Sequence, residues 1–314
     1  MSDGQQAHLR AGLAYGLAAY LSWGFIPVYF KLVKAFPAIE VLGHRIVWSV
    51  LLVGIVLILQ HGWAETSACI RSKRTMLWLL GSTTMIALNW LVFIWAVGKG
   101  YVLEASLGYF INPLVNVLLG FLFLRERLRP GQVVGVLLAA VGVVNLTIHQ
   151  GQVPWIALAL AATFGLYGLL RKTAQVGPLV GLTVETSLLL PIGLYFAAAG
   201  VWRDWAGAGT LGFHEYKWLP LSGVVTAVPL LWFAAAAKRL RLSTLGFLQY
   251  VSPTCQFLLA IFAYGERFTP VHLASFCCIW AALLIYSMDS LRGYWITQAR
   301  QEETSAKPCA ALRQ

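Results

Sequence analysis

Two long apolar segments decide the fold of this chain: GYFINPLVNVLLGFLFLRERLRP at residues 108–130 and GFLQYVSPTCQFLLAIFAYGERFTP at residues 246–270. Each segment has a proline in its first half and a Glu-Arg pair close to its end. A membrane-spanning helix needs about 20 mostly apolar residues. Both segments meet this requirement before their charged pair, so both predict helices that cross a membrane.

The composition of the 314 residues also indicates a lipid environment. Hydrophobic residues make up 59% of the chain and charged residues only 11%, with a mean hydropathy of +0.72, whereas soluble domains carry about 25% charged residues. The net charge of +11 does not indicate nucleic-acid binding, because the basic residues fall in short clusters between apolar runs. With ten spans, most of these clusters lie on the same side of the membrane as the two termini. Because cytoplasmic loops carry an excess of Lys and Arg, both termini are predicted to be cytoplasmic.

Ten stretches of the sequence are long and apolar enough to span the membrane. We therefore expect an all-α integral membrane protein with a short cytoplasmic N-terminus, residues 1–10, and a polar cytoplasmic tail, residues 291–314. The expected spans lie near residues 11–33, 39–59, 75–97, 102–124, 131–148, 154–171, 178–199, 218–237, 243–264 and 270–289.

Similar residues recur at a nearly constant distance along the chain. Placing Pro113 on Pro253, an offset of 140, also superimposes the two Glu-Arg pairs. An earlier pair of segments, residues 17–31 and 158–172, aligns with an offset of 141. We interpret each Glu-Arg pair as a charge pair that closes a span and holds the tight turn at the next proline.

The repeat divides the chain into residues 11–149 and residues 150–290, with five expected spans each. Because five is odd, the two halves must cross the membrane in opposite directions, as an inverted repeat. Two such halves can exchange inward-open and outward-open states of nearly equal energy around one central site. This symmetry favours a transporter.

Five motifs resemble those of a known family: WGFIPVYFK, HRIVWS, NWLVFIWAV, EASLGYFINPL and FGLYGLLRK. Over roughly residues 10–290 the chain is similar to the RarD-type branch of the EamA group, in the drug/metabolite transporter superfamily. The resemblance implies ten helices in two EamA repeats, a bacterial inner-membrane location and a transport function, with export as the expected direction. It also implies a cavity built from the first, third, fourth, sixth, eighth and ninth helices. The family name refers to chloramphenicol sensitivity.

The prolines of the fourth and ninth spans mark the expected cavity. Pro113 and Pro253 each remove a backbone donor and free a carbonyl one turn earlier, and in lipid that carbonyl needs a protein or water partner. The two helices are therefore expected to bend around a cavity; the alternative is a packing kink. Polar and aromatic side chains beside the prolines are candidate cavity-lining groups: Tyr109, Asn112, Gln249 and Tyr250.

Two charged side chains lie well inside expected spans. Arg45 and Glu185 each stand about seven residues from a span end, roughly 10 Å at about 1.5 Å per residue. A charge at that depth costs at least about 2.5–3.5 kcal/mol, so it normally faces a cavity or a partner. We expect Arg45 to attract an anionic substrate group and Glu185 to bind a cationic group or a proton. The alternatives are snorkelling for Arg45 and a structural ion pair for Glu185.

Three further side chains complete the candidate substrate cavity. Asn89 and Trp90 lie inside the third span and Trp23 lies deep in the first. A buried Asn needs hydrogen-bond partners, and a Trp ring offers a face for ligand rings or cations. The alternative for both tryptophans is a core or interfacial anchor.

The sequence contains no motif of catalysis, metal binding or ATP hydrolysis. GxSxG, Walker A and GxGxxG are absent, and the five cysteines show no CxxC spacing. We therefore expect no enzyme, no metal and no cofactor. Gly135 and Gly142 lie on one face of the fifth span, which leaves packing within the chain and contact in a homodimer both open.

The favoured function is a secondary transporter, an exporter of small amphipathic metabolites or drugs. It would alternate access around a central cavity, with or without proton coupling. Its partners would be the lipid bilayer and a small-molecule substrate. The alternative is a membrane protein that does not transport, such as a membrane enzyme or an accessory subunit.

Overall fold

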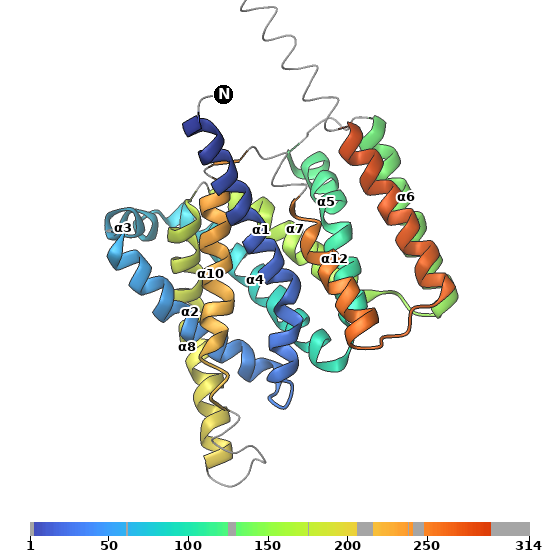
Figure 1. Ribbon diagram of the computed structural model, residues 1–314. Helices are drawn as coiled ribbons and strands as arrows, with labels where there is room; N and C mark the ends of the chain where they lie inside the picture. The colour runs from blue at the N-terminus through green and yellow to red at the C-terminus, as the bar shows by residue number, and fades with distance from the viewer. Residues whose placement is uncertain are drawn as a thin grey trace, which may run out of the picture. The chain divides into compact units, whose positions relative to one another are not determined.

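The computed structural model describes residues 3–60, 62–124, 130–174, 176–205, 216–237, 239–240 and 248–289, and the described elements are all helical (Figure 1). In chain order they are α1 (Asp3–Leu32), α2 (Ala38–Leu59), α3 (Trp63–Arg71), α4 (Lys73–Lys99), α5 (Val102–Leu124), α6 (Pro130–Gln150), α7 (Trp155–Ala174), α8 (Pro178–Trp205), α10 (Leu221–Ala237), α12 (Val251–Leu258) and the π-helix η1 (Leu259–Ala263). A last helix covers Pro270–Asp289.

Length and composition make this an all-α membrane protein, as the sequence predicts. Among the described residues, seven helices are long and apolar enough to cross a bilayer. Three apolar helices are shorter: Trp155–Arg171, Leu221–Phe233 and Val251–Ala263. The expected total of ten spans stays a prediction. The nine-residue helix α3, between the second and third expected spans, was not expected from the sequence.

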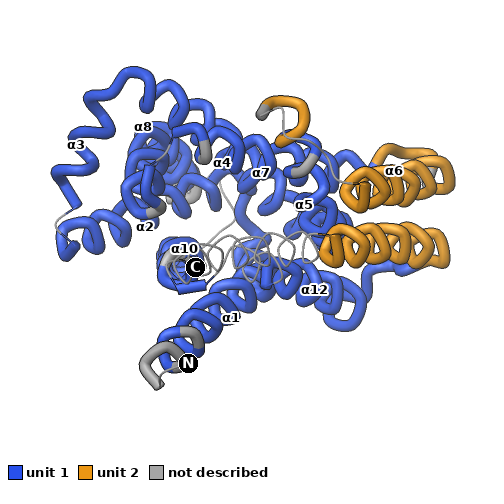
Figure 2. The backbone as a smooth tube through the Cα atoms, turned by 90° about the horizontal axis from the view of Figure 1, so that it is seen from above, with its two compact units in different colours: residues 1–119, 154–268 blue, residues 120–153, 269–314 orange. Residues whose placement is uncertain are grey.

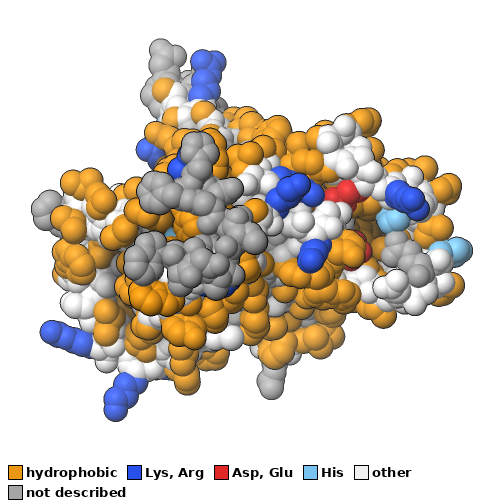
Figure 3. All heavy atoms as spheres, turned by 90° about the horizontal axis from the view of Figure 1, so that it is seen from below, with side chains coloured by type: hydrophobic (Ala, Val, Ile, Leu, Met, Phe, Trp, Pro, Cys, Tyr) orange, Lys and Arg blue, Asp and Glu red, His pale blue; other side chains and the backbone are white. Residues whose placement is uncertain are grey.

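The outer surface of the helices is strongly apolar. Leu59, Leu77 and Phe262 are 72%, 71% and 80% exposed, and the face shown in Figure 3 is largely hydrophobic with scattered Lys and Arg side chains. Soluble monomers rarely expose apolar patches of more than a few hundred Å². Lipid tails are the solvent that such a surface fits.

The chain forms two compact units, coloured separately in Figure 2. The first comprises residues 1–119 and 154–268, and the second comprises residues 120–153 and 269–314. These units are defined by spatial contact and not by sequence similarity. The expected repeat boundaries at residues 149 and 150 therefore stay a prediction.

Helix pairs within the first unit follow the pattern that an inverted repeat would produce. Helix α1 packs against α10, and α7 packs against α4; the two pairs are equivalent under the repeat offset. Close contacts match as well, because a Cβ at Gly24 would lie 2.6 Å from Cys255 Cβ and one at Gly165 would lie 3.0 Å from Val115 Cγ1. These contacts support the inverted repeat, which itself stays a prediction.

In the second unit, α6 packs closely against the helix Pro270–Asp289. A Cβ at Gly142 would lie 2.9 Å from the carbonyl oxygen of Ser275, and the Asn145 amide donates to Ser275 Oγ at 3.0 Å. Small residues here let two helices approach within the chain. A homodimer stays a prediction.

Helix α5 begins at a carboxylate supplied by a distant part of the chain. Glu266 accepts hydrogen bonds from the backbone N–H groups of Val102 and Leu103, each at 2.8 Å, with one oxygen for each. The first N–H groups of a helix have no partner within it, so Glu266 caps α5. This contact is more specific than the charge pair that we expected at this position. The other expected pair, Glu126-Arg127, lies outside the described residues.

The two prolines occupy different positions in their helices. Pro113 stands inside α5, where its ring removes one helical hydrogen bond. Pro253 stands in the first turn of α12, where a helix tolerates proline because that N–H has no helical partner. The Pro253 carbonyl accepts a hydrogen bond from Ser106 Oγ of α5 at 2.8 Å, so α5 and α12 are joined at this point.

Candidate functional site

Four helices of the first unit meet around the guanidinium group of Arg45. Arg45 on α2 is only 6% exposed, and its Nε donates a hydrogen bond to Thr226 Oγ1 of α10 at 2.9 Å. Its guanidinium carbon lies 4.2 Å from the ring centroid of Trp90 on α4 and 5.6 Å from that of Phe30 on α1. Arg45 and Trp90, two of the predicted cavity residues, are thus brought together.

These contacts compensate only part of the cost of burying the charge. A desolvated cation–π contact is worth about 2 kcal/mol and a neutral hydrogen bond about 0.5–1.5 kcal/mol. Removing an ion from water costs several kcal/mol even after the protein relaxes. The Arg45 position is therefore expensive for the fold, which is typical of intramembrane charges with a functional role.

Asn89 and Tyr109 form a polar connection beside the Arg45 site. The Asn89 amide on α4 donates to the Leu160 carbonyl and to Thr163 Oγ1 of α7, each at 3.0 Å. Its oxygen accepts a hydrogen bond from the Tyr109 hydroxyl of α5 at 3.3 Å. Asn89 therefore satisfies its buried amide by joining three helices, and its role in a substrate cavity stays a prediction.

Aromatic rings continue the same region from helix to helix. Phe93 lies between Phe30 and Tyr109, with ring centroids 5.9 Å and 5.7 Å away, and Tyr109 meets Phe164 of α7 edge-on at 6.1 Å. We call Phe30, Phe93, Tyr109 and Phe164 the aromatic row. It offers ring faces and edges, but no charge, next to Arg45.

The second buried charge, Glu185 on α8, has a cation of the chain beside it. Arg171 Nε of α7 lies 3.7 Å from Glu185 Oε1. Ser82 of α4 donates a hydrogen bond to Oε1 at 2.6 Å, and the Tyr167 hydroxyl donates one to Oε2 at 3.3 Å. This is the arrangement of the structural ion pair that the sequence left open for Glu185.

The two charges are held in an equivalent way in the two expected halves. Thr226, in the third span of the second half, binds Arg45 in the second span of the first half. Ser82, in the third span of the first half, binds Glu185 in the second span of the second half. A hydroxyl from one half thus holds the buried charge of the other.

The described contacts of Arg45 do not include three of the predicted cavity residues, Trp23, Gln249 and Tyr250. Trp23 is half-buried and packs against Tyr20 and Phe233, with ring centroids 5.3 Å and 5.7 Å away. Gln249 and Tyr250 are half-buried in the turn before α12. Their place in a substrate cavity stays a prediction.

Asn112 of α5 is fully buried one turn after Tyr109. Neither its amide nitrogen nor its oxygen has a hydrogen-bond partner among the described residues. Residues three apart share a face of a helix, so Asn112 lies on the Tyr109 face of α5. Buried polar atoms without partners are rare in folded proteins, and this amide is available to a ligand or to water.

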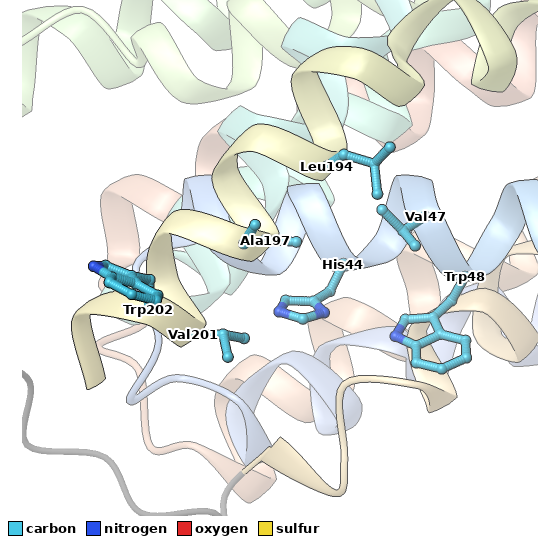
Figure 4. Close-up of a pocket in the computed structure, with 8 residues that line it drawn as sticks. His44, Val47, Trp48, Leu194, Ala197, Val201 and Trp202 are labelled. Carbon is cyan, nitrogen blue, oxygen red and sulfur yellow. The ribbon is translucent and has the colours of Figure 1, made fainter. Parts of the chain in front are cut away.

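An apolar groove of about 510 Å³ lies between α2 and α8 (Figure 4), and its lining includes neither Arg45 nor the partners of Arg45. It is lined by His44 and Trp48 from α2 and by Leu194, Val201 and Trp202 from α8, among others. Successive helical residues point about 100° apart, so neighbouring His44 and Arg45 face different sides of α2. The groove is lined by one imidazole, two indole rings and otherwise aliphatic side chains, which fits lipid better than a charged solute.

The described residues contain no group of three or more His, Cys, Asp or Glu side chains that could hold a metal ion.

Comparison with known proteins identifies the family. Residues 10–148 match the EamA-like transporter family. An uncharacterized transporter of Pseudomonas aeruginosa is 46% identical over 91% of this chain and 96% of its own length. The protein RarD of Escherichia coli K12 is 44% identical over 90% of this chain and 95% of its own length. The chain belongs to the RarD-type branch of the EamA-like transporter family.

More distant relatives agree with this membership. A second protein of Pseudomonas aeruginosa, named chloramphenicol-sensitive protein RarD, is 32% identical to this RarD-type chain over 90% of the chain and 95% of its own length. A protein solved by crystallography is 21% identical, with a TM-score of 0.57 over 90% of this chain and 98% of that one, which shows a shared fold. This RarD-type protein is therefore a multi-pass membrane protein of a transporter family whose relatives named here are bacterial.

Several contacts at these sites were missed by the sequence analysis. Thr226, Phe30, Ser82 and Tyr167 carry no individual signal, because hydroxyls and rings are frequent in apolar helices. Arg171 could have been found, since it lies in the FGLYGLLRK motif, only 14 positions before Glu185 along the chain.

Proposed function

We propose that this RarD-type protein is a secondary transporter that exports small amphipathic metabolites or drugs by alternating access around a central site. The observation that carries the proposal is the Arg45 position. A guanidinium is buried among α1, α2, α4 and α10, against Trp90 and Phe30. A fold accepts such an expensive charge where a solute is to be recognised.

The equivalent packing of the two expected halves supports alternating access. Each buried charge is held by a hydroxyl of the opposite half, so rocking of one half against the other would change both sites together. Inverted repeats exchange inward-open and outward-open states through such motions. Both termini would face the cytoplasm in this arrangement.

Proton coupling, where it occurs, would use Glu185. Its carboxylate is almost completely buried and accepts hydrogen bonds from Ser82 and Tyr167. Movement of Arg171 away from it would leave a buried carboxylate that favours protonation. Glu185→Gln should abolish accumulation driven by an imposed pH gradient and preserve exchange at equal pH. Unchanged gradient-driven accumulation in this variant would assign Glu185 to structure alone.

The transport proposal is tested first by ligand binding and then by flux. Purified protein in detergent is heated with amino acids, nucleosides, sugar phosphates, polyamines and chloramphenicol, each in excess. A ligand at 100 times its Kd stabilises the folded state by about 2.7 kcal/mol, which gives a clear shift in Tm.

Compounds that bind are then tested for saturable flux in liposomes. Arg45→Gln should abolish the flux and Arg74→Gln, which removes an exposed charge of α4, should not. Binding without any flux would contradict a transport function.

A further inference from the structure

Among the described residues, one of the two buried charges, Glu185, has an oppositely charged partner, and the other, Arg45, has none. Glu185 has Arg171 at 3.7 Å, so its charge is balanced within the protein. No acidic side chain lies within ion-pair distance of Arg45 among the residues that the structure describes. The central region therefore carries an uncompensated positive charge, and its negative counterpart is not supplied by the described parts of the chain.

The hydrogen-bonding capacity of Arg45 is also largely unused. A guanidinium group has five N–H donors in a planar fork. The structure describes one hydrogen bond from it, Nε to Thr226. The Trp90 and Phe30 rings contact the guanidinium but accept no conventional hydrogen bond. The two terminal nitrogens, which form the fork that binds carboxylate and phosphate, donate to none of the described residues.

Apolar and neutral groups surround this fork. The aromatic row, Phe30, Phe93, Tyr109 and Phe164, extends from Arg45 toward α7. The Tyr109 hydroxyl is already bonded to Asn89. None of these groups carries a charge that could pair with a second charge on the substrate, whereas their rings stack well on an aromatic or planar apolar body.

We infer that the substrate is an amphipathic organic anion, whose carboxylate or related acidic group pairs with Arg45 and whose apolar or aromatic body packs on Trp90 and the aromatic row. The inference rests on the proposed function and specifies that the transported substrate carries a negative charge. Glu185 is no part of the substrate contact in this arrangement, because Arg171 already balances it. A cationic or neutral solute of the same shape would leave the guanidinium unpaired and should therefore bind more weakly.

Three probes that share one ring and differ in charge test the sign: phenylacetate, phenylacetamide and phenethylamine. Binding is measured calorimetrically on the full-length protein in a nonionic detergent without anionic lipid, so that lipid headgroups do not compete. Phenylacetate, or benzylphosphonate as a second anion, should bind at least tenfold more tightly than the amide and the amine, a difference of about 1.4 kcal/mol. Arg45→Gln should remove this preference, and Arg74→Gln, a matched loss of one exposed positive charge, should keep it.

Arg45→Lys is the second variant, for the case that Arg45→Gln does not fold, because lysine keeps the positive charge at this position. It should retain anion preference with weaker binding, since an ammonium cannot form the two-pronged contact. The inference is overturned if phenylacetamide or phenethylamine binds as tightly as both anions, if no anion binds, or if folded Arg45→Gln binds the anions as wild type does.

Flux in phosphatidylcholine liposomes separates this inference from the transport proposal. Saturable flux of the amine or the amide, with no preference for anions, would preserve transport and refute the anionic substrate. Arg45-dependent binding of anions with no flux of any of them would preserve the anion site and refute transport.

Discussion

The capping of α5 by Glu266 gives a prediction whose magnitude can be worked from the structure. The carboxylate accepts two hydrogen bonds of 2.8 Å from the first N–H groups of the helix. Hydrogen bonds to charged groups contribute about 1.5–3 kcal/mol when buried, but this side chain is only half-buried, and loss of an N-terminal cap typically costs about 1 kcal/mol. We expect Glu266→Ala to lower the free energy of unfolding by about 2 kcal/mol.

A graded variant sharpens this prediction. The amide oxygen of Glu266→Gln can accept one of the two hydrogen bonds, while its NH₂ group faces the other N–H. We therefore expect Glu266→Gln to be more stable than Glu266→Ala by about 1 kcal/mol, because it keeps one of the two hydrogen bonds. Glu65→Gln, an exposed carboxylate in the first turn of α3, is the matched control and should change stability by less than about 0.5 kcal/mol.

Unfolding is followed by tryptophan fluorescence during titration with sodium dodecyl sulfate from mixed micelles. Backbone hydrogen exchange of Val102 and Leu103 gives the local readout, and it should accelerate in Glu266→Ala and less so in Glu266→Gln. Stability of Glu266→Ala within about 0.3 kcal/mol of wild type, with unchanged exchange at these two amides, would refute the capping argument.

The remaining predictions concern pH and two packed positions. Burial raises the pKa of Glu266 above its ordinary value, against the opposing effect of its hydrogen bonds and of Lys31, so the folded state binds this proton more tightly than the unfolded state. The free energy of unfolding should therefore fall as pH rises from about 4.3 through the raised pKa, and Glu266→Gln should flatten this part of a stability–pH profile. Gly142→Val should lower the free energy of unfolding by about 1–3 kcal/mol through overpacking, because even a Cβ would lie 2.9 Å from the Ser275 carbonyl oxygen and Val adds two methyl groups to it. Gly142→Ala should cost less, and equal costs would contradict this reason. Asn89→Leu should cost about 1–2 kcal/mol, because the hydrogen bonds that join α4, α5 and α7 are lost and each is worth about 0.6 kcal/mol in a membrane protein; an unchanged unfolding midpoint would contradict this role.

The helical membrane architecture could be predicted from the sequence because lipid imposes one rule. Every backbone N–H and C=O inside a bilayer must be satisfied within the protein, so long apolar runs form helices. The runs around residues 39–59, 75–97 and 178–199 became α2, α4 and α8, although α4 and α8 extend past the expected edges. The helix α3 escaped prediction because its nine residues are too polar and too short for a hydropathy signal.

The candidate site was predictable as a set of costly residues but not as a set of contacts. Arg45 and Glu185 are recognisable in the sequence, because charges inside apolar runs are rare. Their partners are not, because Thr226 is 181 positions from Arg45 and Ser82 is 103 positions from Glu185. The sequence left open whether Glu185 meets a substrate group or a structural partner, and only the packed helices show Arg171 beside it.

The sequence by itself determined the membrane solvent, the long apolar helices α2, α4 and α8, the repeat offset and the positions where a charge or a proline needs compensation. The tertiary structure alone decided how each need is met: Glu185 by Arg171, the start of α5 by Glu266, and Arg45 by rings and one hydroxyl. The physical reason is that hydropathy measures the cost of burying a group at one position. What offsets that cost is a contact between helices far apart in the chain, and it exists only once they have packed.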